Sequence, residues 1–203
     1  MNNKGQLIVF SGPSGVGKGT VLQHYLAGHP RAMVSVSATT RNPRPGEVDG
    51  VHYHFMSREG FEKLVADGQM LEHACYNGNY YGTPRPAVEA ARAEGRDVVL
   101  EIEVQGALQV KKLCPDALLV FVLPPSWEEL EHRLSGRGTE DAQTVAKRMA
   151  IAAGELPLAH EYDYAIVNDT VEQASARLEQ IVEANRFTAD NMNEFINEVS
   201  EHA

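Results

Sequence analysis

The feature that most constrains the fold is a glycine-rich loop, SGPSGVGKGT at residues 11–20, directly after the short apolar run of residues 6–10. A short apolar run that ends at a turn signal is typical of a buried strand in a parallel sheet. Apolar residues between positions 21 and 26 then follow a helical stripe. The order strand, glycine-rich turn, helix predicts an α/β protein with a parallel sheet.

The loop contains the pattern G-x-x-x-x-G-K from Gly12 to Lys18, which is the main part of the P-loop motif. Its physical basis is a nest of backbone N–H groups at a helix N-terminus, where the helix dipole favours an anion. Lys18 adds a mobile positive charge for the β- and γ-phosphates of a nucleoside triphosphate. The predicted ATP-binding residues of this loop are Gly12, Pro13, Ser14, Gly15, Val16, Gly17, Lys18, Gly19 and Thr20.

Gly19 stands where most P-loops carry a serine or threonine whose hydroxyl binds Mg²⁺. Direct ligation of Mg²⁺ by this loop is therefore in doubt, although Thr20 offers a hydroxyl to a phosphate oxygen. The GKGT ending resembles nucleoside monophosphate kinases. It counts against the small GTPases, and the chain has no N-K-x-D guanine-reading motif.

Strand and helix patterns alternate along the chain except in a mainly β segment at 37–83. Further strands are expected at 33–37, 97–103, 117–123 and 164–168, with a long helix from about 140 to 160 and an amphipathic tail after 171. The expected architecture is a three-layer parallel-sheet core formed by residues 1–36 and 84–203, with an inserted lobe at 37–83 and a helical lid at about 133–150.

The composition excludes several classes of protein. The chain has 203 residues, a formal charge of −10 and 43% hydrophobic residues, which argues for one ordinary globular core and against a nucleic-acid binder. No apolar run reaches the length of a membrane span or a signal-peptide core. Cys75 and Cys114 are expected to be reduced, small core residues, so we expect a cytoplasmic protein.

The inserted segment gathers groups suited to a phosphomonoester. Arg41, Arg44, Tyr53 and Tyr81 form a set of hydrogen-bond donors, and arginine forks match phosphate geometry. In and beside the same segment, the Glu72 carboxylate can accept hydrogen bonds, and the Ser37 and Thr83 hydroxyls can donate them.

Four stretches resemble guanylate kinases in order along the chain: the P-loop, the segment from Ser35 to Tyr53, the NGNYYGTP hairpin and the SGRGTE loop. The resemblance implies phosphate transfer from ATP to GMP in purine nucleotide metabolism, with Mg²⁺ as cofactor. It makes Ser37, Glu72 and Thr83 base contacts and Glu47 a supporting residue of the GMP site.

The resemblance also implies roles for residues at the edges of the core. Glu101 and Glu103 follow a predicted central strand, at the end where open α/β sheets bind ligands. Glu101 would lie near Mg²⁺, through water, and Glu103 near the guanine, although many family members carry aspartate at both positions. The implied lid arginines are Arg133, Arg137 and Arg148, and Asn168 is implied near the adenine.

Two alternatives remain at this stage. One is a nucleoside monophosphate kinase for another acceptor, such as AMP or UMP. The other is a non-catalytic guanylate-kinase-like binding module. A homodimer is left open, because the amphipathic stretch at 192–199 could cover a partner, although packing on the chain's own core is favoured.

Overall fold

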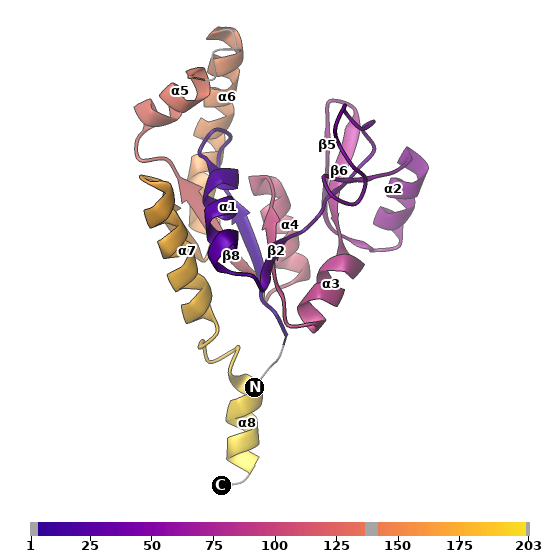
Figure 1. The fold of residues 1–203 in the computed structure, drawn as a ribbon, viewed down its shortest axis with the longest axis vertical. Helices are drawn as coiled ribbons and strands as arrows, with labels where there is room; N and C mark the ends of the chain where they lie inside the picture. Colours follow the sequence, from indigo (N-terminus) through magenta and orange to yellow (C-terminus); the bar gives the residue numbers. More distant parts are fainter. Residues whose placement is uncertain (1–3, 137–141, 202–203) are drawn as a thin grey trace.

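The computed structural model describes residues 4–136 and 142–201 (Figure 1). Its larger sheet has five parallel strands in the order β2-β7-β1-β8-β9. These strands are β1 (Leu7–Ser11), β2 (Ala32–Val34), β7 (Asp97–Glu101), β8 (Leu118–Leu123) and β9 (Tyr164–Val167). The predicted parallel sheet is confirmed, with the glycine-rich loop at the carboxyl end of its central strand.

Helices cover both faces of this sheet and complete the three layers. On one face α1 (Lys18–Gly28) and α7 (Val171–Asn185) pack on β1 and β8 through a core that includes Tyr25 and Leu178. On the other face lie α3 (Arg85–Ala93) and α4 (Val104–Leu113). The sheet strands are apolar on both faces because both faces are covered.

A second sheet, in the order β4-β3-β6-β5, is built from the segment between β2 and α3. Its strands are β3 (Ala38–Thr39), β4 (His54–Phe55), β5 (Met70–Tyr76) and β6 (Asn79–Pro84). The helix α2 (Arg58–Ala66) begins at Ser57, whose hydroxyl accepts from the Gly60 N–H at 3.1 Å, and it packs on this sheet through Phe61.

The strand expected at 33–37 is shorter than predicted. It ends at Val34, because the chain leaves the parallel sheet there and joins the second sheet at Ala38. The Asn77-Gly78 hairpin is confirmed, and both residues have positive φ, at 47° and 79°. That backbone matches the right-handed twist of the strands on either side.

After β8 the chain forms α5 (Trp127–Ser135) and α6 (Ala142–Glu155). The long helix predicted to 160 ends at Glu155 and continues as a 3-10 helix, η1 (Leu156–Glu161), with Pro157 in its first turn. In Figure 1, α5 and α6 lie on one side and the second sheet with α2 on the other, both beyond the end of the core that carries the glycine-rich loop.

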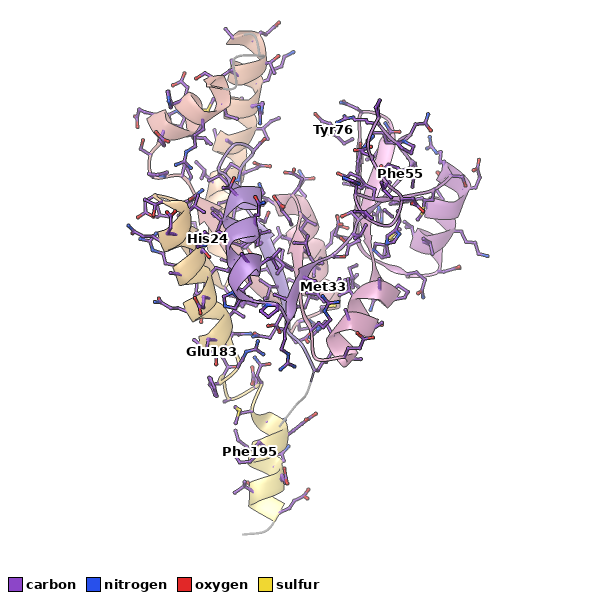
Figure 2. All side chains as sticks on the ribbon, in the orientation of Figure 1. His24, Met33, Phe55, Tyr76, Glu183 and Phe195 are labelled. Atoms are coloured by element: carbon purple, nitrogen blue, oxygen red, sulfur yellow. The ribbon has the colours of Figure 1, made fainter. Side chains whose placement is uncertain are left out.

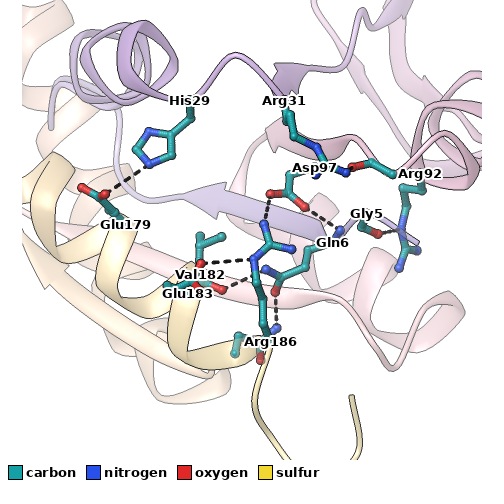
Figure 3. Close-up of polar contacts among 12 residues, drawn as sticks. Gly5, Gln6, His29, Arg31, Arg92, Asp97, Glu179, Val182, Glu183 and Arg186 are labelled. Carbon is teal, nitrogen blue, oxygen red and sulfur yellow. Dashed lines mark hydrogen bonds and ion pairs between the residues drawn. The ribbon is translucent and has the colours of Figure 1, made fainter. Parts of the chain in front are cut away.

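The opposite end of the core is held by a polar network (Figure 3). Asp97, only 5% exposed, accepts from the Gln6 N–H at 2.8 Å and forms an ion pair with Arg186, at the end of α7. Gln6 also donates to the Val182 carbonyl at 2.8 Å and accepts from Asn185 at 2.6 Å. These contacts tie α7 to the sheet.

The C-terminal helix α8 (Asn193–Glu201) extends away from the core and buries none of its residues (Figure 2). Phe195, Ile196 and Val199 are 39%, 46% and 54% exposed. The expectation that this apolar stripe packs on the chain's own core is therefore wrong. Cys75 is also exposed rather than buried, since it lies near the tip of the hairpin, and Cys114 is half-buried. Among the described residues, no helix has the length and apolar character needed to cross a membrane.

Candidate nucleotide-binding site

Glycine is required at two positions of the loop after β1. Gly12 has φ 146°, and a Cβ there would stand 2.5 Å from the carbonyl oxygen of Val122. Gly17 has φ 92°, and its Cβ would stand 2.6 Å from Nδ2 of Asn168. Residues with a side chain rarely adopt a positive φ. The two glycines therefore allow the loop to curl closely around the start of α1.

Lys18 is the first residue of α1, and its side chain folds back over the loop. Its Nζ donates to the carbonyl oxygens of Gly12 and Pro13, at 2.5 and 3.2 Å. Burial lowers the pKa of this ammonium, and the nearby carboxylates of Glu103, Glu101 and Glu155 oppose the shift. The lysine is therefore held where phosphates bound by the loop would meet it.

Glu101 occupies the space beside Gly19. A Cβ at Gly19 would lie 3.6 and 3.8 Å from the two carboxylate oxygens of Glu101, the last residue of β7. Both separations are ordinary van der Waals contact, and a serine or threonine hydroxyl at this position could donate a hydrogen bond to the carboxylate. Although Glu101 opens onto solvent, the surrounding protein desolvates it and raises its pKa, while Lys18 opposes the rise. The Glu101 carboxylate therefore lies beside the start of α1 and near Lys18.

The predicted lid arginines contact the loop directly. Arg133 of α5 donates to the carbonyl oxygens of Val16 and Asn168, at 3.2 and 3.1 Å, and pairs with Glu129 at 2.8 Å. Arg148 of α6 donates to the Ser14 hydroxyl at 2.7 Å. Arg137 lies outside the described residues. Two arginines from distant parts of the chain thus converge on the loop.

Asn168, which follows β9, is 4% exposed and donates through Nδ2 to the Val16 carbonyl at 2.7 Å. In this arrangement the side chain supports the glycine-rich loop. Sequence reasoning missed this contact, because a span of 152 residues separates the two partners. The predicted role of Asn168 near the adenine stays a prediction.

The predicted phosphomonoester set gathers on the second sheet around Arg41. Its guanidinium lies over the rings of Tyr53 and Phe55, at 5.4 and 5.7 Å, and close enough to the Tyr81 hydroxyl to interact with it. Glu47 binds the same guanidinium through both oxygens, at 2.8 and 2.9 Å. The structure thus brings these donors together.

Glu47 also organises the loop that carries Arg44. Its carboxylate accepts from the Arg44 backbone N–H at 2.7 Å, while the Arg44 side chain is exposed. The Arg41 hydrogen bonds, and then this N–H, lower the pKa of Glu47 to about 2. Glu47 therefore stays charged and holds the Arg41 guanidinium and the Arg44 backbone, while its predicted supporting role in a GMP site stays a prediction.

Glu72 and Thr83 face one another in the β5–β6 pair. The Thr83 hydroxyl donates to Glu72 Oε1 at 2.7 Å, and the two residues are 0% and 8% exposed respectively. Burial raises the pKa of Glu72, and the Thr83 hydrogen bond opposes this. Oε2 points toward α4, where a Cβ on Gly106 would approach within 2.8 Å.

Ser37 and Glu103 lie between the two parts of the site. Ser37 precedes β3 and is half-buried, and its carbonyl accepts from the His54 N–H at 2.8 Å. Glu103 follows β7 directly before α4 and acts electrostatically on Lys18 and on Glu155. Sequence reasoning missed Glu155, since no local signal at the end of α6 indicates that it reaches Lys18.

The parallel sheet, its glycine-rich loop and the arginines around that loop define a P-loop protein of the nucleotide-kinase class. The guanylate kinase family model matches residues 4–185. The chain therefore belongs to the guanylate kinase family.

Individual relatives agree with this assignment. The guanylate kinase of Lactococcus lactis subsp. lactis (strain IL1403) is 54% identical over 192 residues, 95% of this chain and 94% of the relative. That of Streptococcus pneumoniae (strain ATCC BAA-255 / R6) is 54% identical over 95% of this chain and 93% of its own length. The crystal structure of guanylate kinase from Anaplasma phagocytophilum has a TM-score of 0.72 at 34% identity, covering 92% of this chain and 88% of that one.

Proposed function

We propose that this chain transfers the γ-phosphate of ATP to GMP, giving ADP and GDP. The observation that carries the proposal is the pairing of two sites in one molecule. A P-loop with Lys18 lies at the end of the parallel sheet, and a second sheet presents the buried Glu72–Thr83 pair beside the Arg41 cluster. The family assignment gives the same activity.

In this proposal the triphosphate occupies the loop of residues 12–20, and Lys18, Arg133 and Arg148 stabilise the charge on the phosphates. Arg137 is proposed to join them on the strength of the sequence resemblance. The adenine lies toward Asn168. Catalysis of this kind rests on positioning and on cations around the transferred group.

The acceptor GMP is proposed to bind the segment 37–83. Arg41, Arg44, Tyr53 and Tyr81 hold its phosphate, supported by Glu47. Glu72, Thr83, Ser37 and Glu103 bind the guanine. The acceptor oxygen is already anionic at neutral pH, because the second pKa of a phosphomonoester is about 6, so no general base is needed.

The residues present fit a magnesium ion held mainly by the nucleotide. Mg²⁺ is usually bound by one or two carboxylates together with substrate phosphates and waters. Among the described residues no group of three or more acidic, histidine or cysteine side chains could hold a metal, but Glu101 lies beside Gly19 and Lys18. We infer that Glu101 holds the ion through water. The ion would offset charge on the β- and γ-phosphates.

We also propose the division of the chain into a core (1–36 and 84–203), a GMP lobe (37–83) and a lid (about 133–150) that close together on their nucleotides. Closure would exclude the water that hydrolyses ATP. The enzyme is placed in the cytoplasm, where both substrates occur. Its substrates are small molecules, with no nucleic-acid or membrane partner. A homodimer stays a prediction that analytical ultracentrifugation tests.

The first experiment measures ADP formation from MgATP with GMP, AMP, UMP or CMP as acceptor. Of the four acceptors, we expect only GMP to support ADP formation. The Lys18→Ala variant should lose this activity but still bind GMP. Turnover with another monophosphate would leave the ATP site intact and overturn the guanine assignment. GMP binding without transfer would identify a binding module instead.

A further inference from the structure

Tyr76 is a large aromatic residue that the arrangement above does not use. It is the last residue of β5, at the tip of the hairpin, and 68% of it is exposed. A single exposed aromatic side chain is common on protein surfaces, so its meaning depends on what lies beside it. What Tyr76 can contact depends on the face of the hairpin on which it lies.

The strand register places Tyr76 on the same face as Glu72. Successive side chains of a strand alternate between faces, so Glu72, Ala74 and Tyr76 share one face. Their partners on β6 are Thr83, Tyr81 and Asn79 respectively. This face therefore carries the guanine pair, one tyrosine of the Arg41 cluster, and Tyr76.

The opposite face of the hairpin is covered by α2. Tyr80 stacks on Phe61 with ring centroids 5.3 Å apart, and a Cβ on Gly82 would also reach the Phe61 ring, at 3.1 Å. The face of Glu72 looks instead toward α4, where its Oε2 lies against Gly106. Figure 2 shows Tyr76 on the flank of the hairpin that faces the core.

The order of side chains along this face determines which part of a bound nucleotide lies near Tyr76. Glu72 and Thr83 form the first pair, and Ala74 and Tyr81 the second, where Tyr81 meets Arg41. Tyr76 comes one same-face step later, about 7 Å further along the strand. Ala74, being small, leaves room between them. A nucleotide with its base at Glu72 and its phosphate at Arg41 therefore points its phosphate end toward Tyr76.

We propose that Tyr76 contacts the bound acceptor nucleotide, its hydroxyl donating a hydrogen bond to the phosphate of GMP. The inference rests on the proposed function and adds a residue to the acceptor site. The Tyr76 phenol contacts the phosphate rather than the base, because Glu72 and Thr83 bind the base at the other end of the nucleotide. Hydrogen bonds to charged groups are stronger than those between neutral groups, so the contact should affect affinity measurably.

The test compares Tyr76→Phe with Tyr80→Phe by calorimetric titration of GMP and of guanosine. The control removes the same hydroxyl from the same hairpin, but on the other face, where the Tyr80 hydroxyl accepts from Arg58 at 2.9 Å. We expect Tyr76→Phe to weaken GMP binding about tenfold, which corresponds to about 1.4 kcal/mol. Guanosine, which lacks the phosphate, should bind both variants as it binds the wild type.

An unchanged Kd for GMP in Tyr76→Phe would overturn the inference, and so would an equal loss of affinity for GMP and for guanosine. An effect of Tyr80→Phe as large as that of Tyr76→Phe would do the same, since it would indicate a change in the hairpin as a whole. Failure of the proposed function looks different. In that case the wild type itself would neither bind GMP nor form ADP in its presence.

Discussion

Thr83 donates a 2.7 Å hydrogen bond to Glu72 across the β5–β6 pair, and burial raises the pKa of that glutamate. One of the two carboxylate oxygens is thereby fixed in place before any ligand arrives. A charged group in such a position costs stability in the empty protein, which is acceptable where a ligand will pair with it.

Glu72→Gln should separate acceptor recognition from stability. The amide would present a donor to the N1–H and 2-amino donors of guanine, so the KM for GMP should rise at least a hundredfold while the KM for ATP changes little. The free energy of unfolding at pH 8 should stay equal or rise. Because the pKa of folded Glu72 is raised, its contribution is most favourable below the unfolded pKa and is lost as pH rises.

Steady-state kinetics and urea unfolding at pH 4.5 and 8 measure both effects. Glu59→Gln, an exposed residue on α2 of the same lobe, is the matched control and should change neither. A Glu72→Gln protein that keeps its KM for GMP, or that loses stability at pH 8, would contradict the prediction.

Gly17→Ala should disable the ATP site. Its φ of 92° strains any other residue by about 1–3 kcal/mol, and the new Cβ would collide with Asn168 Nδ2 at 2.6 Å. ATP binding should fall far more than GMP binding. Gly28→Ala is the control, since Gly28 is a helical residue with nothing within 4 Å of its Cβ. Titration of each variant with ATP and with GMP measures the two affinities. Equal ATP affinity in Gly17→Ala and Gly28→Ala would contradict the prediction.

Glu47 should give the acceptor lobe an acid-sensitive ion pair. Its hydrogen bonds with the Arg41 guanidinium, and then with the Arg44 backbone N–H, lower its pKa in the folded protein to about 2. The stabilisation is therefore present above the unfolded pKa and is lost as pH falls through the folded one. The stability difference between wild type and Glu47→Gln should shrink from pH 6 to pH 3, as measured by denaturant unfolding. A difference that grows toward pH 3 would have the wrong sign.

Asp97→Asn should lower stability without touching catalysis. The carboxylate is buried between Gln6 and Arg186, at the end of the sheet opposite the glycine-rich loop. Since Arg186 is 40% exposed, the expected loss is about 2 kcal/mol rather than that of a fully buried pair. Thermal unfolding and kinetics measure this.

The control for Asp97→Asn removes the other acidic partner of the same arginine. Glu183 lies 3.3 Å from Arg186 and its side chain is 63% exposed, so Glu183→Gln should cost about 0.5 kcal/mol or less. If the two variants were equally stable, the network at this end of the sheet would not hold α7 in place.

Local signals in the sequence predicted the features that depend on local chemistry. The glycine pattern predicted the loop, and Asn77-Gly78, within the NGNYYGTP stretch, predicted the hairpin. Of the arginines and tyrosines predicted to act together at residues 41–81, Arg41, Tyr53 and Tyr81 lie close to one another, while the Arg44 side chain is exposed. Their individual roles stay predictions.

Features that depend on distant contacts were not predictable. The strand at 33–37 ends early because the chain leaves the parallel sheet for the second sheet. The electrostatic effect of Glu155 on Lys18 arises only in the folded chain. The apolar residues of α8 follow the spacing of a buried helical face, yet none of the residues of α8 is buried. The spacing of apolar residues predicts that one face of a helix is apolar. It does not predict which part of the protein covers that face.

The cations of this site have oxygen partners within the protein. Lys18 binds two loop carbonyls, Arg133 binds two more, and Arg41 binds Glu47. A nucleotide whose phosphate oxygens take these positions would exchange one set of oxygen partners for another. Its affinity would then reflect the difference between the two sets.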